Sequence, residues 1–177
     1  MEQKMAKTRV LCSKEQIAAR VKEMAAQIDR DYAGESIMLL GTLTGSVFFL
    51  TDLAREITLD VELDFIKAFS YQGTQSTGVV EVEYFPSGRC LAGKNVIVVE
   101  DIIDSGTTAK FLKDRLKDSN AKSVKICSLL DKPEGRKVSP LHVDYIGFTI
   151  PNEFVVGYGL DFDQKYRNLS YVGILEN

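Results

Sequence analysis

The stretch from Val96 to Thr108, which reads VIVVEDIIDSGTT, limits what this chain can fold into more than any other part of the sequence. It opens with the unbroken β-branched run Val96–Val99, a pattern typical of a strand buried on both faces of a sheet. A helical pattern follows over Thr107–Lys117, with three apolar residues on one face. A buried strand that leads through a short loop into an amphipathic helix is the repeating unit of α/β folds with a mainly parallel sheet.

The rest of the chain continues this alternation. Ser13 and Gln16 have the spacing of a capping box, which predicts a helix that begins here and runs to about Tyr32. Further strands are predicted at Ile37–Leu40, Val124–Leu130, Val143–Phe148 and Phe154–Tyr158, with a helical pattern over Val47–Ile57. We therefore expect an α/β fold in which helices flank a central, mainly parallel sheet, with residues 1–177 forming a single domain.

Two stretches differ from the others, because apolar and charged residues alternate in them. Residues 61–67 and 79–85 have the pattern of half-buried strands, so we expect a hairpin or flap with one face in water. The segment between them, Ser70–Gly78, is polar and contains two glycines. It is predicted to be a loop with freedom to move.

Composition excludes several classes of protein. The 177 residues carry a net charge of −3, without the basic face that a nucleic-acid-binding protein needs. No apolar run approaches the roughly 20 residues that span a bilayer. The three cysteines are scattered and there is one histidine, which argues against both a disulfide framework and a zinc site. We therefore expect a cytoplasmic protein with no nucleic-acid partner and no membrane partner.

The loop after Val99 combines two kinds of chemistry. Ser105-Gly106-Thr107-Thr108 brings small residues and hydroxyls to a helix N-terminus, where free backbone N–H groups and the helix dipole favour a phosphate. The acidic residues just before it, Glu100, Asp101 and Asp104, would repel a bare phosphate. They make sense if they face sugar hydroxyls or a metal ion, and a phosphorylated ribose satisfies both halves of the loop.

The plain alternative is that Asp104 or Ser105 only caps the helix, while Glu100 and Asp101 end a strand in solvent. Three carboxylates and three hydroxyls within nine residues exceed the needs of capping. Two other phosphate-binding motifs are absent, since the chain has neither GxxxxGK[ST] nor a GxGxxG after a strand.

The signature stretch and several other segments resemble those of a known family. VIVVEDIIDSGTT looks like the phosphoribosyl-pyrophosphate-binding signature of type I phosphoribosyltransferases, and the chain is similar over residues 10–175 to hypoxanthine-guanine phosphoribosyltransferases. The other matching segments are Leu43–Ser46, Ser70-Tyr71 with Gln75–Gly78, Leu129–Pro133, and Ile150-Pro151 through Phe154–Asp161 to Tyr166-Arg167. The resemblance implies the type I phosphoribosyltransferase fold, with a small hood and a mobile lid loop.

The resemblance also assigns roles around the signature. Asp104 would be the general base that accepts a proton from purine N7. Ribose and its 5′-phosphate would be bound by Glu100, Asp101, Asp104, Ser105, Gly106, Thr107 and Thr108. The expected cofactor is Mg²⁺, placed by Glu100, Asp101 and Asp161.

The remaining roles lie outside the signature. The purine would be bound by Lys132 at its 6-oxo group, by stacking on Phe154, by the main chain of Val155, and by Asp161. Pyrophosphate would be bound by Leu43, Thr44, Gly45 and Arg167, with a cis peptide between Leu43 and Thr44. Many relatives have Lys where this chain has Thr44, so that loop departs from the family pattern. Ser70 and Tyr71 would lie on the lid.

Each of these residues has an ordinary alternative when the resemblance is set aside. Lys132 beside Asp131 has the form of a surface ion pair, which contributes about 0–1 kcal/mol. Phe154 fits a core position. Asp161 and Asp163 fit a solvated loop, and either of them suits Arg167 as an ion-pair partner.

The implied reaction transfers 5-phosphoribose from phosphoribosyl pyrophosphate to N9 of hypoxanthine or guanine, giving IMP or GMP and pyrophosphate. Two alternatives are an enzyme that also accepts xanthine, and a non-catalytic regulator that binds the same sugar phosphate. The intact Asp104 and the net charge of −3 favour the enzyme. By analogy with the family we also expect a homodimer or homotetramer.

Overall fold

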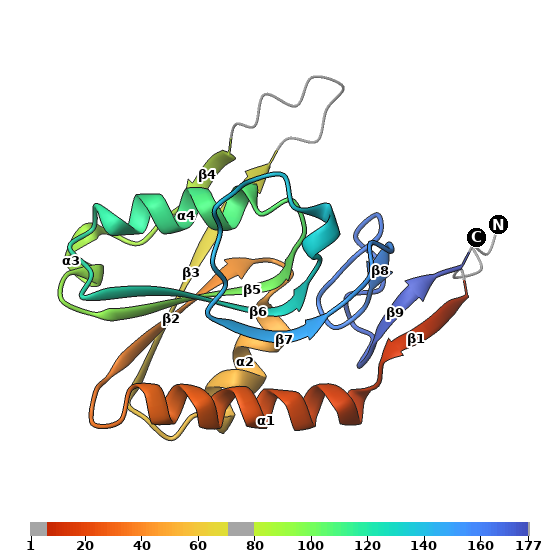
Figure 1. Ribbon diagram of the computed structural model, residues 1–177, viewed down its shortest axis with the longest axis horizontal. Coiled ribbons are helices and arrows are strands. Elements are labelled where there is room, and N and C mark those ends of the chain that lie inside the picture. The colour runs from red at the N-terminus through yellow and green to blue at the C-terminus, as the bar shows by residue number, and fades with distance from the viewer. Residues whose placement is uncertain (1–6, 71–79, 177) are drawn as a thin grey trace.

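The protein, in a computed structural model that describes residues 7–70 and 80–176, contains one large and one small β-sheet (Figure 1). The large sheet has the strand order β4-β3-β2-β5-β6-β7. The strands are β1 (Thr8–Cys12), β2 (Ile37–Leu43), β3 (Val61–Ser70), β4 (Val80–Tyr84), β5 (Asn95–Ile103), β6 (Ser123–Asp131), β7 (Tyr145–Thr149), β8 (Val155–Val156) and β9 (Val172–Leu175). The helices are α1 (Lys14–Asp31), α2 (Val47–Glu56), α3 (Gly88–Leu91) and α4 (Thr107–Lys117), with a 3-10 turn at Pro133–Gly135.

The large sheet is parallel except at one edge, where β4 runs antiparallel to β3. The predicted mainly parallel sheet and the predicted hairpin are both confirmed. The predicted lid lies almost wholly outside the described residues: the β3 backbone ends at Ser70, and Tyr71 is not described.

Helices cover both faces of the large sheet, with α1 and α2 on one side and α4 on the other (Figure 1). Because side chains alternate along a strand, β2 and β5 present apolar residues to both layers. Leu39, Ile97 and Val99 join the cluster that contains the helix residues Met24, Phe49 and Leu53, whereas Met38, Val96 and Val98 pack with Leu112 and Leu116. This two-sided burial is what the β-branched run in β5 predicts.

Local signals correctly predict the boundaries of α1 and α4. The Ser13 side chain accepts from the Gln16 N–H, and the Gln16 side chain accepts from the Ser13 N–H, so the capping box at the start of α1 is complete. Helix α4 has the bounds that its apolar periodicity predicts. No helix in the described part of the chain is long and apolar enough to cross a bilayer.

The small sheet, which we call the hood, has the order β1-β9-β8 and joins the two ends of the described chain. Thr8 pairs with Leu175, and Val155 pairs with Ile174. The sequence patterns predict a short strand near Val155 but neither β1 nor β9. The hood stands at the carboxyl end of the large sheet, beyond β5, β6 and β7 (Figure 1).

Candidate active site

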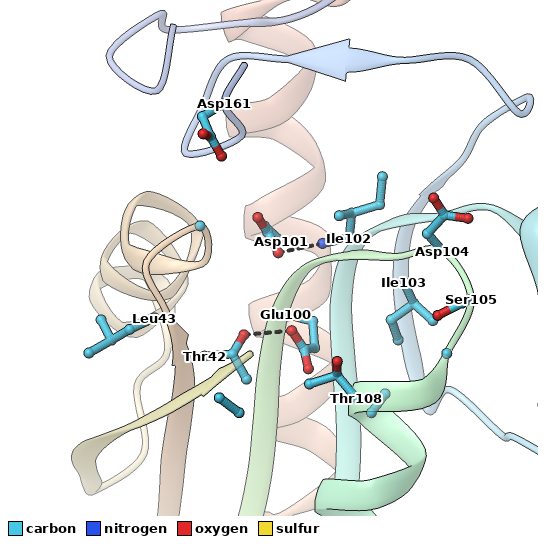
Figure 2. Close-up of a pocket in the computed structure, with 14 residues that line it drawn as sticks. Thr42, Leu43, Glu100, Asp101, Ile102, Ile103, Asp104, Ser105, Thr108 and Asp161 are labelled. Carbon is cyan, nitrogen blue, oxygen red and sulfur yellow. Dashed lines mark hydrogen bonds between the residues drawn. The ribbon is translucent and has the colours of Figure 1, made fainter. Parts of the chain in front are cut away.

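A cavity of about 410 Å³ opens at the carboxyl ends of the central strands, the edge at which α/β folds bind ligands. Figure 2 shows its side chains. It is lined by the ends of β2, β3 and β5, the loop after β2, the loop into α4 with the start of that helix, and one residue of the loop between β8 and β9. These residues are Thr42, Leu43, Gly45, Ala68, Glu100–Gly106, Thr108, Ala109 and Asp161. Nine of the predicted site residues line this one cavity: Leu43, Gly45, Glu100, Asp101, Asp104, Ser105, Gly106, Thr108 and Asp161.

Glu100 lies deepest among the carboxylates and is 6% exposed. The Thr42 hydroxyl donates to its Oε2 at 2.5 Å, while its Oε1 is buried and has no hydrogen-bond partner among the described residues. Burial raises the pKa of Glu100 from 4.5 to about 8; the Thr42 hydrogen bond opposes this rise, and the nearby Asp101 adds to it. Such a carboxylate is ready to receive a cation or a donor that a ligand brings.

Asp101 points to the cavity from the next position, with its Oδ1 accepting from the Ile102 N–H at 2.9 Å. Burial raises its pKa to about 6, hydrogen bonds to the backbone lower it, and the charge of Arg167 lowers it further. Asp161 has the opposite effect, because it is a second acid facing the same space. Figure 2 shows Asp161 reaching from the hood loop toward Asp101.

The turn into α4 is open at its N-terminal end. Gly106 adopts φ +78°, a left-handed conformation, and no side chain caps the helix. The Thr107 N–H donates to Ser105 Oγ at 3.3 Å, and the Ser105 hydroxyl reaches Thr107 Oγ1 at 3.2 Å. Exposed first-turn N–H groups together with these hydroxyls form a site suited to an anion.

Lys132 approaches Asp104, a cavity residue, although Lys132 is not itself among the residues that line the cavity. Lys132 follows β6 directly and its side chain is 7% exposed, whereas the Asp104 side chain is 53% exposed. Lys132 Nζ lies 3.8 Å from Asp104 Oδ2. The sequence alternative of a solvent-exposed pair between Lys132 and Asp131 is wrong, because both side chains are buried and Asp131 pairs with Arg136.

The loop after β2 and the loop between β8 and β9 meet at Gly45 and Gly159. The Leu43–Thr44 peptide bond is cis, as the resemblance implied. Arg167 donates to the Gly159 carbonyl at 2.7 Å and pairs with Asp161 at 2.8 Å. Of the two acids that the sequence offered Arg167, the structure pairs it with Asp161.

The hood also carries the two residues expected to meet the purine base. Phe154 is 54% exposed, so it is not a core residue. Its ring meets Phe162 edge-on with centroids 5.7 Å apart. Val155 is buried in β8, where its backbone pairs with β9.

Two glycine contacts were not predicted from sequence. A Cβ on Gly45 would lie 1.7 Å from Asp101 Oδ2, and a Cβ on Gly159 would lie 1.9 Å from the Gly45 carbonyl oxygen. The loop at Gly45, the end of β5 and the loop at Gly159 therefore pack so closely that neither glycine position has room for a side chain. Thr42 was also missed as the partner of Glu100; its place one residue before a predicted site residue was the only signal.

The described side chains do not by themselves form a complete metal site. Within residues 7–70 and 80–176, no three acidic, histidine or cysteine side chains come together to hold a metal ion. A metal at this site would therefore need further ligands from a substrate or from water, as magnesium commonly does.

Comparison with known proteins agrees with this geometry. The family model described as the phosphoribosyl transferase domain matches residues 11–163. The hypoxanthine-guanine phosphoribosyltransferase of Streptococcus pneumoniae R6 is 47% identical over 169 residues, which is 95% of this chain and 93% of that protein.

Solved structures give the same answer. A hypoxanthine-guanine phosphoribosyltransferase from Bacillus anthracis superposes with a TM-score of 0.89 at 48% identity, covering 98% of this chain and 99% of the other. A hypoxanthine phosphoribosyltransferase from Staphylococcus aureus gives 0.88 at 40% identity, over 95% and 91% of the two chains. The family model includes the turn into α4, the relatives match over most of the chain, and the chain belongs to the hypoxanthine-guanine phosphoribosyltransferases, the transferases of purine salvage.

Proposed function

We propose that this enzyme transfers 5-phosphoribose from phosphoribosyl pyrophosphate to N9 of hypoxanthine or guanine, releasing pyrophosphate and forming IMP or GMP. The observation that carries the proposal is the single cavity in which an anion-binding turn, two carboxylates with raised pKa values and the Asp104 carboxylate line one space. A sugar with a phosphate at one end and a pyrophosphate at the other needs these groups in this order.

The 5′-phosphate is assigned to the turn into α4. Gly106 allows the backbone to approach a ligand closely, and it brings no capping side chain of its own. Among the described residues, the side-chain acceptor for the first turn is Ser105 Oγ, which takes the Thr107 N–H at a long 3.3 Å. Ser105 and Thr107 add hydroxyl donors, since their mutual contact of 3.2 Å is long enough to be exchanged for contacts to phosphate oxygens.

Ribose and Mg²⁺ are assigned to Glu100 and Asp101, with Asp161 facing them. The buried and unpartnered Glu100 Oε1 fits such a group, and so do the raised pKa values of both acids, because a cation would restore the ionised forms. Bound Mg²⁺ would supply Lewis-acid stabilisation of the departing pyrophosphate. These carboxylates would also favour the positive charge that develops on the sugar as its bond to pyrophosphate breaks.

The purine is assigned to the space between Lys132 and the hood. The buried Lys132 would donate to the 6-oxo oxygen, while the exposed Asp104 carboxylate would accept the proton from N7. Phe154 offers a free aromatic face for stacking, and the backbone of Val155 would read the edge of the base.

Pyrophosphate is assigned to the Leu43–Thr44–Gly45 backbone and to Arg167. The lid formed by Ser70 and Tyr71 would close over the reacting centre and exclude water that would otherwise hydrolyse the sugar. Thr44 is uncharged, so Arg167 would be the main positively charged residue at the pyrophosphate site.

The test is a comparison of hypoxanthine, guanine, xanthine and adenine as acceptors, with phosphoribosyl pyrophosphate and Mg²⁺, followed by the release of pyrophosphate. Hypoxanthine and guanine should be converted, whereas adenine should not, because its 6-amino group offers no acceptor to Lys132. Binding of phosphoribosyl pyrophosphate without turnover of any oxopurine would favour the non-catalytic regulator. Turnover of xanthine would identify the wider-specificity variant.

Assembly and location complete the proposal. We expect a homodimer or homotetramer by analogy with the family, and light scattering of the purified protein tests this. A cytoplasmic location is supported by the three unpaired cysteines, two of them buried, because such thiols persist in a reducing compartment.

A further inference from the structure

The loop after β6 contains a buried ion pair that the assignments above do not use. Arg136 Nη2 is in short contact with Asp131 Oδ1, and the two side chains are only 17% and 8% exposed. Asp131 is the last residue of β6, and the next residue is Lys132. A charged pair removed from water in this way is seldom present for stability alone, since desolvation cancels much of its attraction.

Lys132 therefore has one acid near its ammonium, and a second acid precedes it in the chain. Among the described residues, Asp104 is the only acid within 4.0 Å of its Nζ, at 3.8 Å. Asp131 is adjacent in sequence and equally buried, yet its carboxylate is directed to Arg136. The nearest carboxylate is thus 3.8 Å from the lysine ammonium, beyond hydrogen-bond distance. A buried carboxylate on the preceding residue that lost its own cation would attract this ammonium strongly.

Arg136 is also fixed to the phosphate-binding turn. A Cβ added to Gly106 would lie 2.7 Å from Arg136 Cδ, so the arginine stem packs directly against that glycine. The next residue, Lys137, donates its N–H to the Ser105 carbonyl at 2.9 Å. Arg136 therefore has one contact that concerns the sugar phosphate and another that concerns the base.

We propose that Arg136 is a positioning residue: by occupying the Asp131 carboxylate, it keeps the Lys132 ammonium free for the 6-oxo group of the purine. This inference rests on the proposed function, in which Lys132 reads that group. Arg136 would then affect how tightly the purine binds without contacting the purine itself.

Removing the charge of Arg136 should let Asp131 compete with the purine for the Lys132 ammonium. In Arg136→Gln, Asp131 would remain as a buried carboxylate without its cation, a costly state that the protein relieves by recruiting the nearest ammonium. Lys132 has a flexible four-carbon stem and can turn toward it. In Asp131→Asn/Arg136→Gln, the competing charge is gone as well, so Lys132 should return to the purine although Arg136 is still missing.

The experiment measures the KM of hypoxanthine and the KM of phosphoribosyl pyrophosphate for wild type and both variants. For Arg136→Gln we expect the hypoxanthine KM to rise roughly 10- to 100-fold, the range set by one hydrogen bond to a charged group. In the double variant it should return to near the wild-type value. The arginine stem also packs against Gly106, and both variants lack it. Any change in the KM of phosphoribosyl pyrophosphate that comes from this packing should therefore appear in both variants.

Arg55→Gln is the matched control, since Arg55 is 79% exposed and pairs with Asp52 at 3.8 Å far from these residues. It should leave both KM values unchanged. A folded Arg136→Gln protein with a wild-type hypoxanthine KM would overturn the inference, as would a double variant as impaired as the single one, which would reveal a purely structural role. If Arg136→Gln does not fold, the double variant alone decides by the same criterion. Absence of hypoxanthine turnover in the wild type would instead remove the proposed function.

Discussion

Replacement of Gly45 by alanine should displace the Asp101 carboxylate and leave the rest of the fold in place. The added Cβ would lie 1.7 Å from Asp101 Oδ2, and an ordinary contact begins at 3.4 Å, so the oxygen must retreat by about 1.7 Å. That side chain is short. The retreat therefore breaks the 2.9 Å hydrogen bond that its Oδ1 accepts from the Ile102 N–H.

The size of the effect follows from that hydrogen bond. Hydrogen bonds to charged groups contribute about 1.5–3 kcal/mol, and a domain of this size loses roughly 2–4 °C in Tm per kcal/mol. Gly45→Ala should therefore lower Tm by about 3–12 °C. If Asp101 also contacts the ribose, kcat/KM for phosphoribosyl pyrophosphate should fall by about 10- to 150-fold, the equivalent of the same free energy.

The assay combines thermal unfolding with steady-state kinetics. Gly88→Ala is the matched control, because a Cβ there meets nothing within 4 Å, and it should change neither quantity. Asp101→Ala combined with Gly45→Ala should cost no more stability than Asp101→Ala alone, since the clash has been removed. An unchanged Tm and kcat/KM in Gly45→Ala would refute the reasoning.

Three other variants test separate parts of the site. Asp104→Asn should lower kcat by about 10²–10⁴-fold while changing the KM of phosphoribosyl pyrophosphate little; wild-type turnover would remove the general-base role. The folded pKa of Glu100, about 8, exceeds its ordinary 4.5, so the ligand-free protein should lose stability as pH rises between these values. Glu100→Gln should flatten that decline in urea titrations, and an equal slope would contradict the assignment. Gly159→Ala should destabilise by more than about 2 kcal/mol, because the residue has φ +104° and its Cβ would meet backbone; a normal Tm would show that the hood can shift.

Local patterns predicted the parts of the fold that depend on local physics. The β-branched run in β5, the capping box of α1 and the apolar face of α4 each determine their own element. Strands β1 and β9 were not predicted, because each is stabilised by a partner from the far end of the chain. No short window of sequence contains that information.

The same distinction applies to the site. Glu100, Asp101 and Asp104 belong to one continuous stretch, so the sequence alone predicts their convergence at a strand end. The stacking of Gly159 on Gly45, and the pairing of Asp131 with Arg136, depend on tertiary contacts or on the exact course of a loop. The resemblance to a family identified many of the residues, but not the contacts that hold them.

The hood pairing has a consequence for the order in which the two halves of the cavity form. The half to which we assign the sugar phosphate comes from residues 95–117, a strand and a helix that are contiguous in the chain. The half to which we assign the base needs Val155 paired with β9, and β9 paired with β1, a closure between Thr8 and Leu175. Loops of such length close late, because their entropy cost precedes any gain from contact. If these assignments hold, the folding chain should form the site for the sugar phosphate before it forms the site that selects the base.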